Sequence, residues 1–350
     1  MRRLFFALFF LFGCTPAESF DRQAMLESIG LEVVIPQYEL LVERTVALES
    51  AAATFCAEPS ADTLEATRAA FRSAKEPLKM AEPWAFGPYT DSPLRLGPEI
   101  DLWPGRAATV DDRLAGTDAV DVAAIEAAGG YAKGFPALDH LLFAYQLEAL
   151  RDERACTYLR SLTSQIRGVA EELLAAWAPS GGDYIGLFIR GETPFAGVQG
   201  STSVLVEQLI YTLENVRELK IGKPFGKRDS GVVQPEAIEA PDSGRSLQDA
   251  EDAVRGTERA YRGAEGEASL GVEDLLLARR PELAPEIDAG FQRVYDAFDA
   301  VPGPLAVAIT ESTTEVEALY QAVKDLQVLF AVDLAQALGV TITFNPTDGD

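Results

Sequence analysis

The stretch GFPALDHLLF, residues 134–143, holds the only histidine of this 350-residue chain, His140, directly after the carboxylate Asp139. An imidazole beside a carboxylate can serve as an acid–base pair or contribute to a metal site. The sequence supplies no recognisable nucleophile or oxyanion partner for such a pair. We therefore expect a structural pair, with His140 hydrogen-bonded to a neighbouring carbonyl or carboxylate. Ligand binding is the main alternative.

A second group of candidate residues comes from about 84–117, where helical periodicity gives way to prolines, glycines and aromatics. Carboxylates set among aromatics could coordinate a hard cation such as ferric iron or calcium. They could also hold a cationic ligand by cation–π contact. The alternative is a proline-rich strap that packs over the first helices through its own aromatics. Together with Glu82, which lies just before this segment, the two groups give the candidate ligand-binding residues Asp139, His140, Glu82, Trp84, Asp101 and Trp103.

Cys56 and Cys156 are the two cysteines beyond the N-terminal segment. In an oxidising compartment they predict a disulfide that joins the end of one helix to the start of another, with two separate buried thiols as the alternative. Neither cysteine has CxxC spacing, and a single histidine cannot build a two-histidine zinc site. A Gly-x-Ser-x-Gly elbow, a P-loop and a dinucleotide fingerprint are also missing.

The N-terminal segment carries an export signal, in which two arginines precede an apolar run at 4–12 that is too short to span a bilayer. The run ends in Leu-Phe-Gly-Cys, which resembles the lipobox of bacterial lipoproteins. The resemblance implies cleavage before Cys14 and lipid on it. Because Thr15 rather than Asp follows, it also implies an outer-membrane location facing the periplasm. We expect a signal peptide at 1–13 and a lipidated tether at 14–20, with an ordinary cleaved signal as the alternative.

The formal net charge of −25 restricts the partners. Phosphate backbones and anionic lipid surfaces require concentrated Lys and Arg, so we expect no nucleic-acid partner. Attachment to a membrane would come through the lipid on Cys14 instead. A cationic partner or a metal ion is compatible with the acidity, although solvated helix faces alone would explain it.

Helical periodicity covers most of the remaining chain. Period-two alternation is confined to 340–344, and the polar, Gly- and Pro-rich stretch at 221–245 predicts a linker. The predicted fold is therefore all-α, with two consecutive four-helix-bundle-like domains at 21–220 and 246–350. Helices are expected near 41–55, 61–80 with a kink at Pro77, 151–177, 198–219, 246–262, 269–279, 282–299 and 313–337.

Several short sequences, in their order along the chain, resemble the imelysin family, also called peptidase family M75. They are Ile35-Pro36, FRSAKEPLKMAEPWAFGP at 71–88, WPGR at 103–106, GFPALDHLLF, KIGKPFG at 220–226, the residues at 243–249 and the closing LGVTITFNPTDGD. The resemblance covers almost the whole mature chain. It implies an exported or lipid-anchored bacterial protein of two helical bundles that is linked to iron acquisition.

Members of this family with a proposed metal site carry Gly-x-His-x-x-Glu. Gly134 matches the glycine, but Pro136 stands at the histidine position and Asp139 at the glutamate position. Proline offers no side-chain ligand, so the motif is not carried over. On a helix His140 would lie one turn beyond Pro136 on the same face, where it could replace the missing ligand.

These observations predict a lipid-anchored periplasmic protein that binds a ligand without catalysis, at the cleft between its bundles, in connection with iron or metal uptake. Iron or another divalent cation is the candidate cofactor, and the ligand stays open. One alternative is a divergent metallopeptidase of the M75 type that uses Asp139 and His140. The other is a structural lipoprotein that docks an outer-membrane receptor or another membrane partner.

Overall fold

The structure is a computed structural model that describes residues 20–228, 231–266 and 269–342. The described residues form helices joined by turns, with no strand among them, so the all-α prediction is confirmed. None of the helices in these ranges combines the length and hydrophobicity needed to cross a bilayer. The predicted signal peptide, Cys14, the tether up to residue 19 and the TDGD ending lie outside the described residues.

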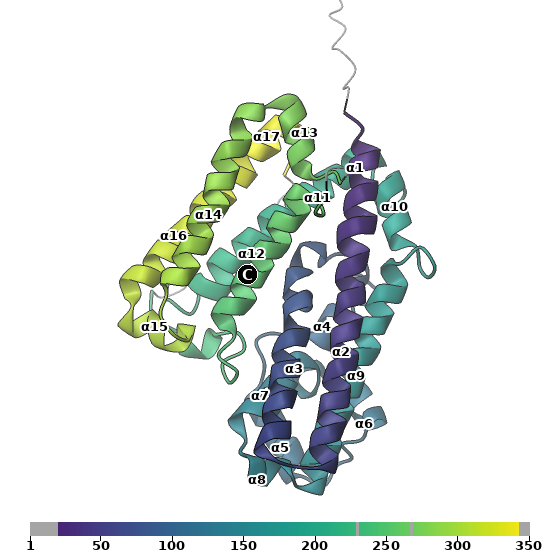
Figure 1. Cartoon of the computed structure of the whole chain (residues 1–350), viewed down its shortest axis with the longest axis vertical. Coiled ribbons are helices and arrows are strands. Elements are labelled where there is room, and N and C mark those ends of the chain that lie inside the picture. The colour runs from purple at the N-terminus through teal and green to yellow at the C-terminus, as the bar shows by residue number, and fades with distance from the viewer. Residues whose placement is uncertain (1–19, 229–230, 267–268, 343–350) are drawn as a thin grey trace, which may run out of the picture.

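One group of helices is built around a long continuous helical run (Figure 1). It consists of α1 (Arg22–Ser28), the π-helical turn η1 (Ile29–Val34) and α2 (Ile35–Ala57). It packs against α3 (Ala61–Met80) and α9 (Glu153–Trp177). Apolar side chains at helical spacing explain this packing, because they form one buried face on each helix. The expected stripe of α2 is confirmed, since Leu41, Thr45, Leu48, Ala52 and Phe55 are all buried.

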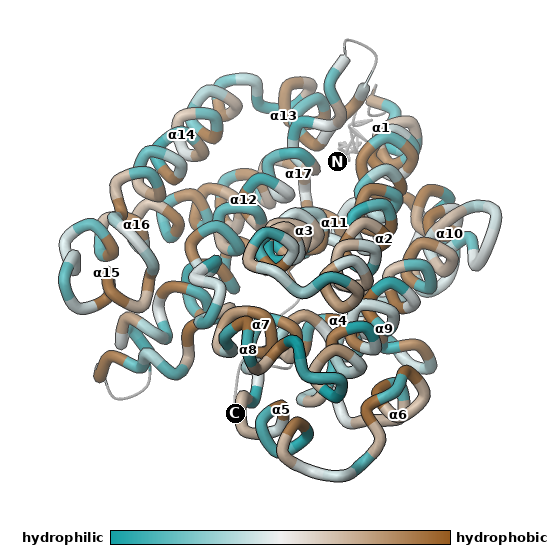
Figure 2. The backbone as a smooth tube through the Cα atoms, turned by 60° about the horizontal axis from the view of Figure 1, so that its bottom comes forward, coloured by the Kyte–Doolittle hydropathy of each residue, from teal (hydrophilic) through white to brown (hydrophobic). Residues whose placement is uncertain are grey.

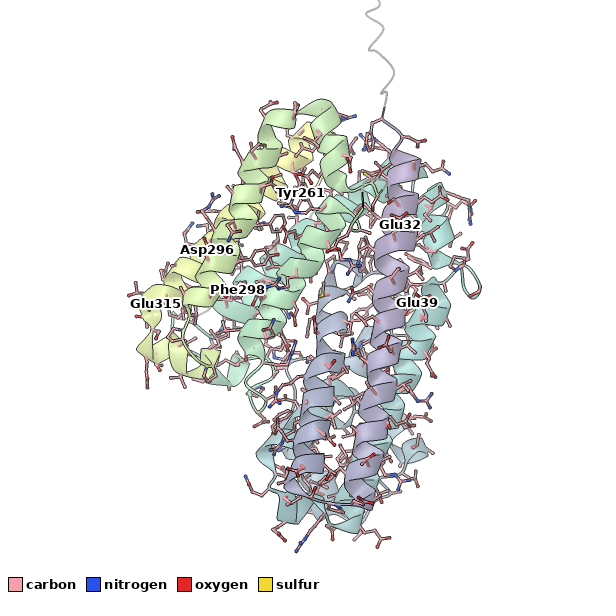
Figure 3. The ribbon with its side chains drawn as sticks, in the orientation of Figure 1. Glu32, Glu39, Tyr261, Asp296, Phe298 and Glu315 are labelled. Carbon is pink, nitrogen blue, oxygen red and sulfur yellow. A yellow bond between two sulfur atoms is a disulfide. The ribbon has the colours of Figure 1, made fainter. Side chains whose placement is uncertain are left out.

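The second group contains α12 (Ser246–Arg262), α14 (Ala284–Ala300) and α16 (Thr313–Val328). The short helices α13 (Val272–Arg279), α15 (Leu305–Glu311) and α17 (Ala335–Leu338) close its ends. Tyr261 of α12 lies among the helices, 6.0 Å from the Phe291 ring and 5.6 Å from the Phe330 ring, whereas Asp296 lies on the outer face (Figure 3). Along these helices polar and apolar segments alternate, as expected when one side faces the core (Figure 2).

The two groups are in close contact along α3 and α12. A Cβ on Gly256 of α12 would lie 2.1 Å from the carbonyl oxygen of Met80, so glycine is required for this approach. The helix α11 (Gly197–Asn215), continued by the π-helical turn η5 (Val216–Gly222), packs against α1 and α10 (Tyr184–Arg190) on one side and against α12 and α16 on the other. The seam between the groups is therefore a packed interior.

The prediction that about 84–117 lacks regular structure is wrong in part. The segment contains η3 (Gly87–Tyr89), α4 (Gly97–Ile100) and the nine-residue helix α5 (Ala107–Ala115). In α5 Val110 is buried and Leu114, one turn further on, packs partly against the core, so its apolar stripe is too short to stand out as periodicity. The stretch at 221–245 joins η5 to α12, and part of it is packed into the fold: η6 (Pro235–Ala237) and the buried residues Ile238, Glu239 and Ala240 lie within it.

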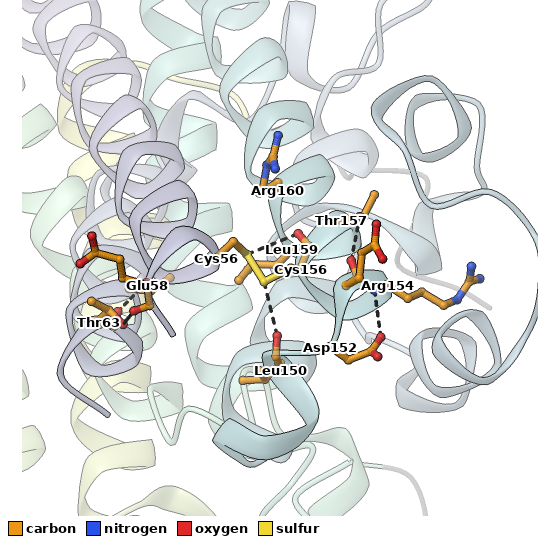
Figure 4. Close-up of a disulfide and its surroundings, with 12 residues drawn as sticks. Cys56, Glu58, Thr63, Leu150, Asp152, Arg154, Cys156, Thr157, Leu159 and Arg160 are labelled. Atoms are coloured by element: carbon orange, nitrogen blue, oxygen red, sulfur yellow. Dashed lines mark hydrogen bonds between the residues drawn. A yellow bond between two sulfur atoms is a disulfide. The ribbon is translucent and has the colours of Figure 1, made fainter. Parts of the chain in front are cut away.

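A disulfide joins the last turn of α2 to the first turn of α9 (Figure 4). The Cα atoms of Cys56 and Cys156 are 5.6 Å apart, and the bond closes a sequence separation of 100 residues. Next to it, Ser60 begins α3 with a capping box, in which its hydroxyl accepts a hydrogen bond from the Thr63 amide at 3.1 Å. This end of the first helical group is thus fixed covalently as well as by packing.

Candidate ligand-binding site

A cavity of about 190 Å³ lies between elements of the first helical group and the segment that leads into α12, so its walls come from parts of the chain that are far apart in sequence. Lys75 comes from α3. Residues 101–107 come from the proline-rich segment at 84–117, here called the strap, and from the start of α5. Residues 236–242 come from the segment predicted as a linker. The fourth segment is the first half of α7 (Gly134–Ala144). The cavity brings together four of the predicted candidates, which are Asp101, Trp103, Asp139 and His140.

The start of α7 is held in place by Gly134, which has a positive φ of 72°. A Cβ at this position would lie 2.4 Å from the carbonyl oxygen of Ile100, so any other residue would clash with the strap. The Gly134 amide donates to Oε1 of Gln165 at 3.1 Å, and Nε2 of Gln165 donates to the Glu99 carbonyl at 2.9 Å. Two turns of helix then present Pro136, Asp139 and His140 to the cavity.

His140 is bracketed by two aspartates. Its Nδ1 lies 2.8 Å from Oδ2 of Asp242 and its Nε2 lies 2.9 Å from Oδ1 of Asp111, which also accepts a hydrogen bond from the Tyr145 hydroxyl at 2.5 Å. The hydrogen bond to Asp242, followed by that to Asp111, outweighs burial and raises the pKa of His140 to about 9. At neutral pH the side chain is therefore an imidazolium that donates from both nitrogens. It has no lone pair for a metal ion or for accepting a substrate proton.

The surroundings of Asp139 disfavour its charged form, in contrast to those of His140. Its side chain is buried, at 2% exposure, and Oδ2 accepts a hydrogen bond from the Asp242 amide at 3.2 Å. The other oxygen, Oδ1, is buried without a hydrogen-bond partner. Burial raises the pKa of Asp139 to about 6. The Ser243 hydroxyl, which lies near the carboxylate without completing a hydrogen bond to Oδ1, and the charge of Lys75 oppose this effect. At pH 7 and above, the cavity therefore contains an ionised carboxylate with an unused acceptor.

Trp103 contributes a second polar atom without a partner. Its indole Nε1 is buried and makes no hydrogen bond. Beside it on the rim, the guanidinium of Arg106 lies 4.4 Å from the centre of the Tyr131 ring, in a cation–π contact. The segment at 101–107 thus lines the cavity with one indole that has an unpaired donor and one guanidinium that is already engaged.

A buried network of charges lies directly behind the cavity. Lys79 donates to Glu82 at 3.0 Å, to Asp101 at 2.6 Å and to Glu239. Lys220, on η5, donates to Glu82 at 2.8 Å and to Glu239 at 2.5 Å. The network therefore ties together α3, the strap, η5 and the 236–242 segment, across the seam between the helical groups.

The pKa values in this network show how strongly the charges support one another. Burial alone would raise the pKa of Glu239, but the charges of Lys220 and then Lys79 hold it far below its usual value. Burial would lower the pKa of Lys79, but Asp101 and Glu239 raise it well above the ordinary value. These shifts favour the charged form of each group, and the groups are already paired with one another.

Two predicted candidates do not line the cavity. Glu82 is one ion pair away, because it shares Lys79 with Asp101. Trp84, in the short helix η2 (Glu82–Trp84), is 1% exposed and belongs to the hydrophobic core. Four residues that matter here were missed by sequence reasoning: Lys75, Lys220, Glu239 and Asp242. A signal existed for Lys75, since it follows the buried Phe71 by four residues and so falls on the inner face of α3.

The residues present do not fit a metal ion. In the part of the chain that the structure describes, no group of three or more His, Cys, Asp and Glu side chains is arranged to hold one. Pro136 occupies the position of the family histidine, and both nitrogens of His140 are engaged by aspartates. Asp101 and Glu239 are neutralised by buried lysines. The possibility that His140 replaces the missing ligand is therefore not supported by its surroundings.

Fold and site together define an all-helical protein with a pocket that is lined by buried charged residues and apolar walls. The sequence profile of the imelysin family, Peptidase M75, matches residues 34–330, and the chain belongs to that family. It is 27% identical over 315 residues to "Iron-regulated protein A" of Synechococcus elongatus, covering 88% of this chain and 83% of that protein.

Solved structures share the fold. An imelysin-like protein from Psychrobacter arcticum 273-4 superposes with a TM-score of 0.78 at 18% identity, over 92% of this chain and 97% of that one. A Parabacteroides distasonis ATCC 8503 protein, described provisionally as an iron-regulated protein A precursor, gives a TM-score of 0.76 at 20% identity, over 93% and 97% of the two chains. The chain therefore has the imelysin-like fold over nearly its whole length.

Proposed function

We propose that this chain is a non-enzymatic binding or accessory protein in iron or metal uptake, and that the pocket lined by Asp139 holds the ligand. The observation that carries the proposal is the buried Oδ1 of Asp139, an acceptor without a partner in a pocket built by four separate segments. The iron-related part is supported by the name of the Synechococcus relative. Within this proposal the two groups act as four-helix-bundle-like domains at 21–220 and 246–350, joined by 221–245.

Binding is favoured over catalysis by the chemistry of the pocket. His140 is an imidazolium held by two aspartates, so it is a poor general base. None of the described residues that line the pocket is a serine, threonine or cysteine. A divergent peptidase of the M75 type would need a nucleophile or a metal-bound water there, and we rank it below binding for this reason.

We also propose that lipid on Cys14 attaches the protein to the outer membrane, facing the periplasm, where an outer-membrane receptor or another uptake partner would be within reach. The supporting observation is the Leu-Phe-Gly-Cys sequence after a short apolar run. Fractionation of cells tests this step. Cys14→Ser is expected to move the protein from the outer-membrane fraction to the soluble fraction or to leave it unprocessed, and unchanged fractionation would contradict lipidation.

The uptake role is tested by growth under iron limitation. A strain without the gene is expected to grow more slowly than its parent when iron is chelated, and the intact gene should restore growth. Ala107→Trp places a large side chain at the rim of the pocket and should fail to restore it. Ala115→Trp, an exposed alanine at the other end of α5, is the matched control and should restore it.

Two results would contradict the proposal. One is normal growth of the deletion strain under iron limitation. The other is full complementation by Ala107→Trp at normal protein abundance, which would separate the iron phenotype from the pocket.

A further inference from the structure

We propose that the pocket binds a small alkylammonium group, with the carboxylate of Asp139 as its counter-ion. This inference rests on the proposed function, because it names the chemical class of ligand for the same pocket. An alkylammonium combines three N–H donors and a positive charge with a short apolar stem. Each of these features has a counterpart in the lining.

The positive charge of the ligand would balance the buried carboxylate of Asp139. An ionised carboxylate oxygen that is buried without a donor is costly, and a charge-assisted hydrogen bond from a ligand ammonium would remove that cost. The other buried carboxylates of the lining are already satisfied: Asp101 accepts from Lys75 at 3.1 Å and from Lys79 at 2.6 Å, and Glu239 accepts from Lys79 and Lys220. Among the described lining residues, Asp139 therefore has the free buried acceptor.

The remaining charges of the lining favour a cation over an anion. Each cationic side chain is engaged: Lys75 with Asp101 and, at 3.7 Å, Asp249; His140 with its two aspartates; and Arg106 over the Tyr131 ring. Of the five carboxylates of the lining, Asp101 and Glu239 are paired with buried lysines and Asp242 with His140. This leaves Asp139 and Glu236 to favour a cation.

Size and apolar walls limit the ligand further. The cavity of about 190 Å³ is smaller than the roughly 300–1,000 Å³ of most small-molecule pockets, which suits a short chain rather than a large chelate. Trp103, Pro136 and Ile238 supply apolar walls for such a chain. The unpaired indole Nε1 of Trp103 could donate to a hydroxyl or carbonyl oxygen at its far end. A free amine and the side chain of a lysine on a partner protein share this chemistry.

Isothermal titration of the purified protein at pH 7.5, above the pKa of Asp139, tests the inference. The probes are 5-amino-1-pentanol, its uncharged analogue 1,5-pentanediol, and Nα-acetyl-lysine methylamide as a model of a lysine side chain. We expect the amine to bind and the diol not to bind. Asp139→Asn keeps the size of the side chain and should weaken amine binding by at least about tenfold.

Asp112→Asn is the matched control for charge, because this exposed carboxylate lies on α5 outside the pocket lining; it should leave the affinity within about twofold. Preferential binding of the lysine model would support the inference and assign the ammonium to a partner protein. Equal binding to Asp139→Asn and wild type would overturn it. The inference would also be overturned if neither amine bound. If Ala107→Trp still failed in the growth assay in that case, the proposed function would stay intact. Amine binding with normal growth of the deletion strain would instead remove the uptake role alone.

Discussion

The imidazole Nδ1 of His140 lies 2.8 Å from the carboxylate of Asp242, across 102 positions of the sequence. This contact fastens α7 of the first helical group to the segment that leads into the second. Asp242 also donates its backbone amide to Asp139, so a single residue holds both members of the Asp139–His140 pair. The pair is therefore part of the connection between the groups, and its protonation states affect the stability of that connection.

Replacement of His140 is expected to cost stability in a pH-dependent way. The folded-state pKa of about 9 lies above the ordinary value of 6.5, so the stabilisation is fully present below pH 6.5 and is lost as the pH rises toward 9. Asp111 is half exposed, which weakens the ion pair, and we expect His140→Gln to lower the free energy of unfolding by about 1–2 kcal/mol at pH 6. Urea unfolding from pH 6 to 10 measures it. A difference that stays constant over this range would contradict the assigned charge.

Asp139→Asn is expected to stabilise the protein above pH 6. The native carboxyl titrates near pH 6 instead of 3.8, so the native state binds more protons than the unfolded state between these values, and stability falls as the pH rises through them. Above pH 6 this amounts to about 3 kcal/mol, which the variant avoids. The stability of Asp139→Asn relative to wild type should therefore increase from pH 4 to pH 7. Asp112→Asn controls for the change in net charge. If the stability difference between Asp139→Asn and wild type did not change with pH, the raised pKa of Asp139 would be refuted.

Replacement of Glu239 should lower the free energy of unfolding by more than replacement of His140. Glu239→Gln leaves the ammonium groups of Lys79 and Lys220 buried with one carboxylate fewer, which costs about 3–5 kcal/mol when a buried pair is broken. Because the folded-state pKa of Glu239 is lowered, the loss should be complete at pH 7 and should shrink as the pH falls below about 4.5.

Glu82→Gln is the comparison for this experiment, since Glu82 accepts hydrogen bonds from the same two lysines but its side chain is 20% exposed. Chemical unfolding of both variants should rank Glu239→Gln as the less stable protein. Equal losses would show that burial does not determine the strength of this network.

The disulfide should contribute strongly to stability. In the chain-entropy account a cross-link over 100 residues stabilises by about 4–5 kcal/mol, and the double variant Cys56→Ser/Cys156→Ser should lose this amount in urea unfolding without reductant. With reductant present, wild type and variant should unfold at similar urea concentrations. Detection of two free thiols in the native protein by mass spectrometry would rule the bridge out.

The helices could be predicted because one side of each is apolar at helical spacing. Leu159, Leu162 and Ile166 of α9 are buried as that spacing requires. The strap at 101–107 could be recognised as a candidate from its aromatics and carboxylates, and Asp101 and Trp103 do line the pocket. Local patterns were sufficient for both results.

The partners of these residues could not be predicted in the same way. Nothing near Asp139 in the sequence indicates that Asp242 lies against it, because that contact depends on how α3 and α12 pack, and hence on Gly256. The burial of the lysines behind the pocket could not be predicted either, since buried lysines are rare unless paired and the pairing is visible only in three dimensions. The sequence thus indicated two of the four segments that line the pocket, the strap and α7, and the other two follow from tertiary packing.

The segment at 236–242 serves two purposes at once, as part of the connection between η5 and α12 and as a wall of the pocket. Connecting segments normally tolerate changes in length, because their backbone faces water. Here Glu239 is tied to two lysines, and Ser246, at the start of α12, donates to the Glu239 carbonyl, so an inserted residue would displace the wall. Variation in length among related chains should therefore fall before residue 235. The spacing from Glu239 to Ser246 is a more specific mark of a working pocket than any single side chain within it.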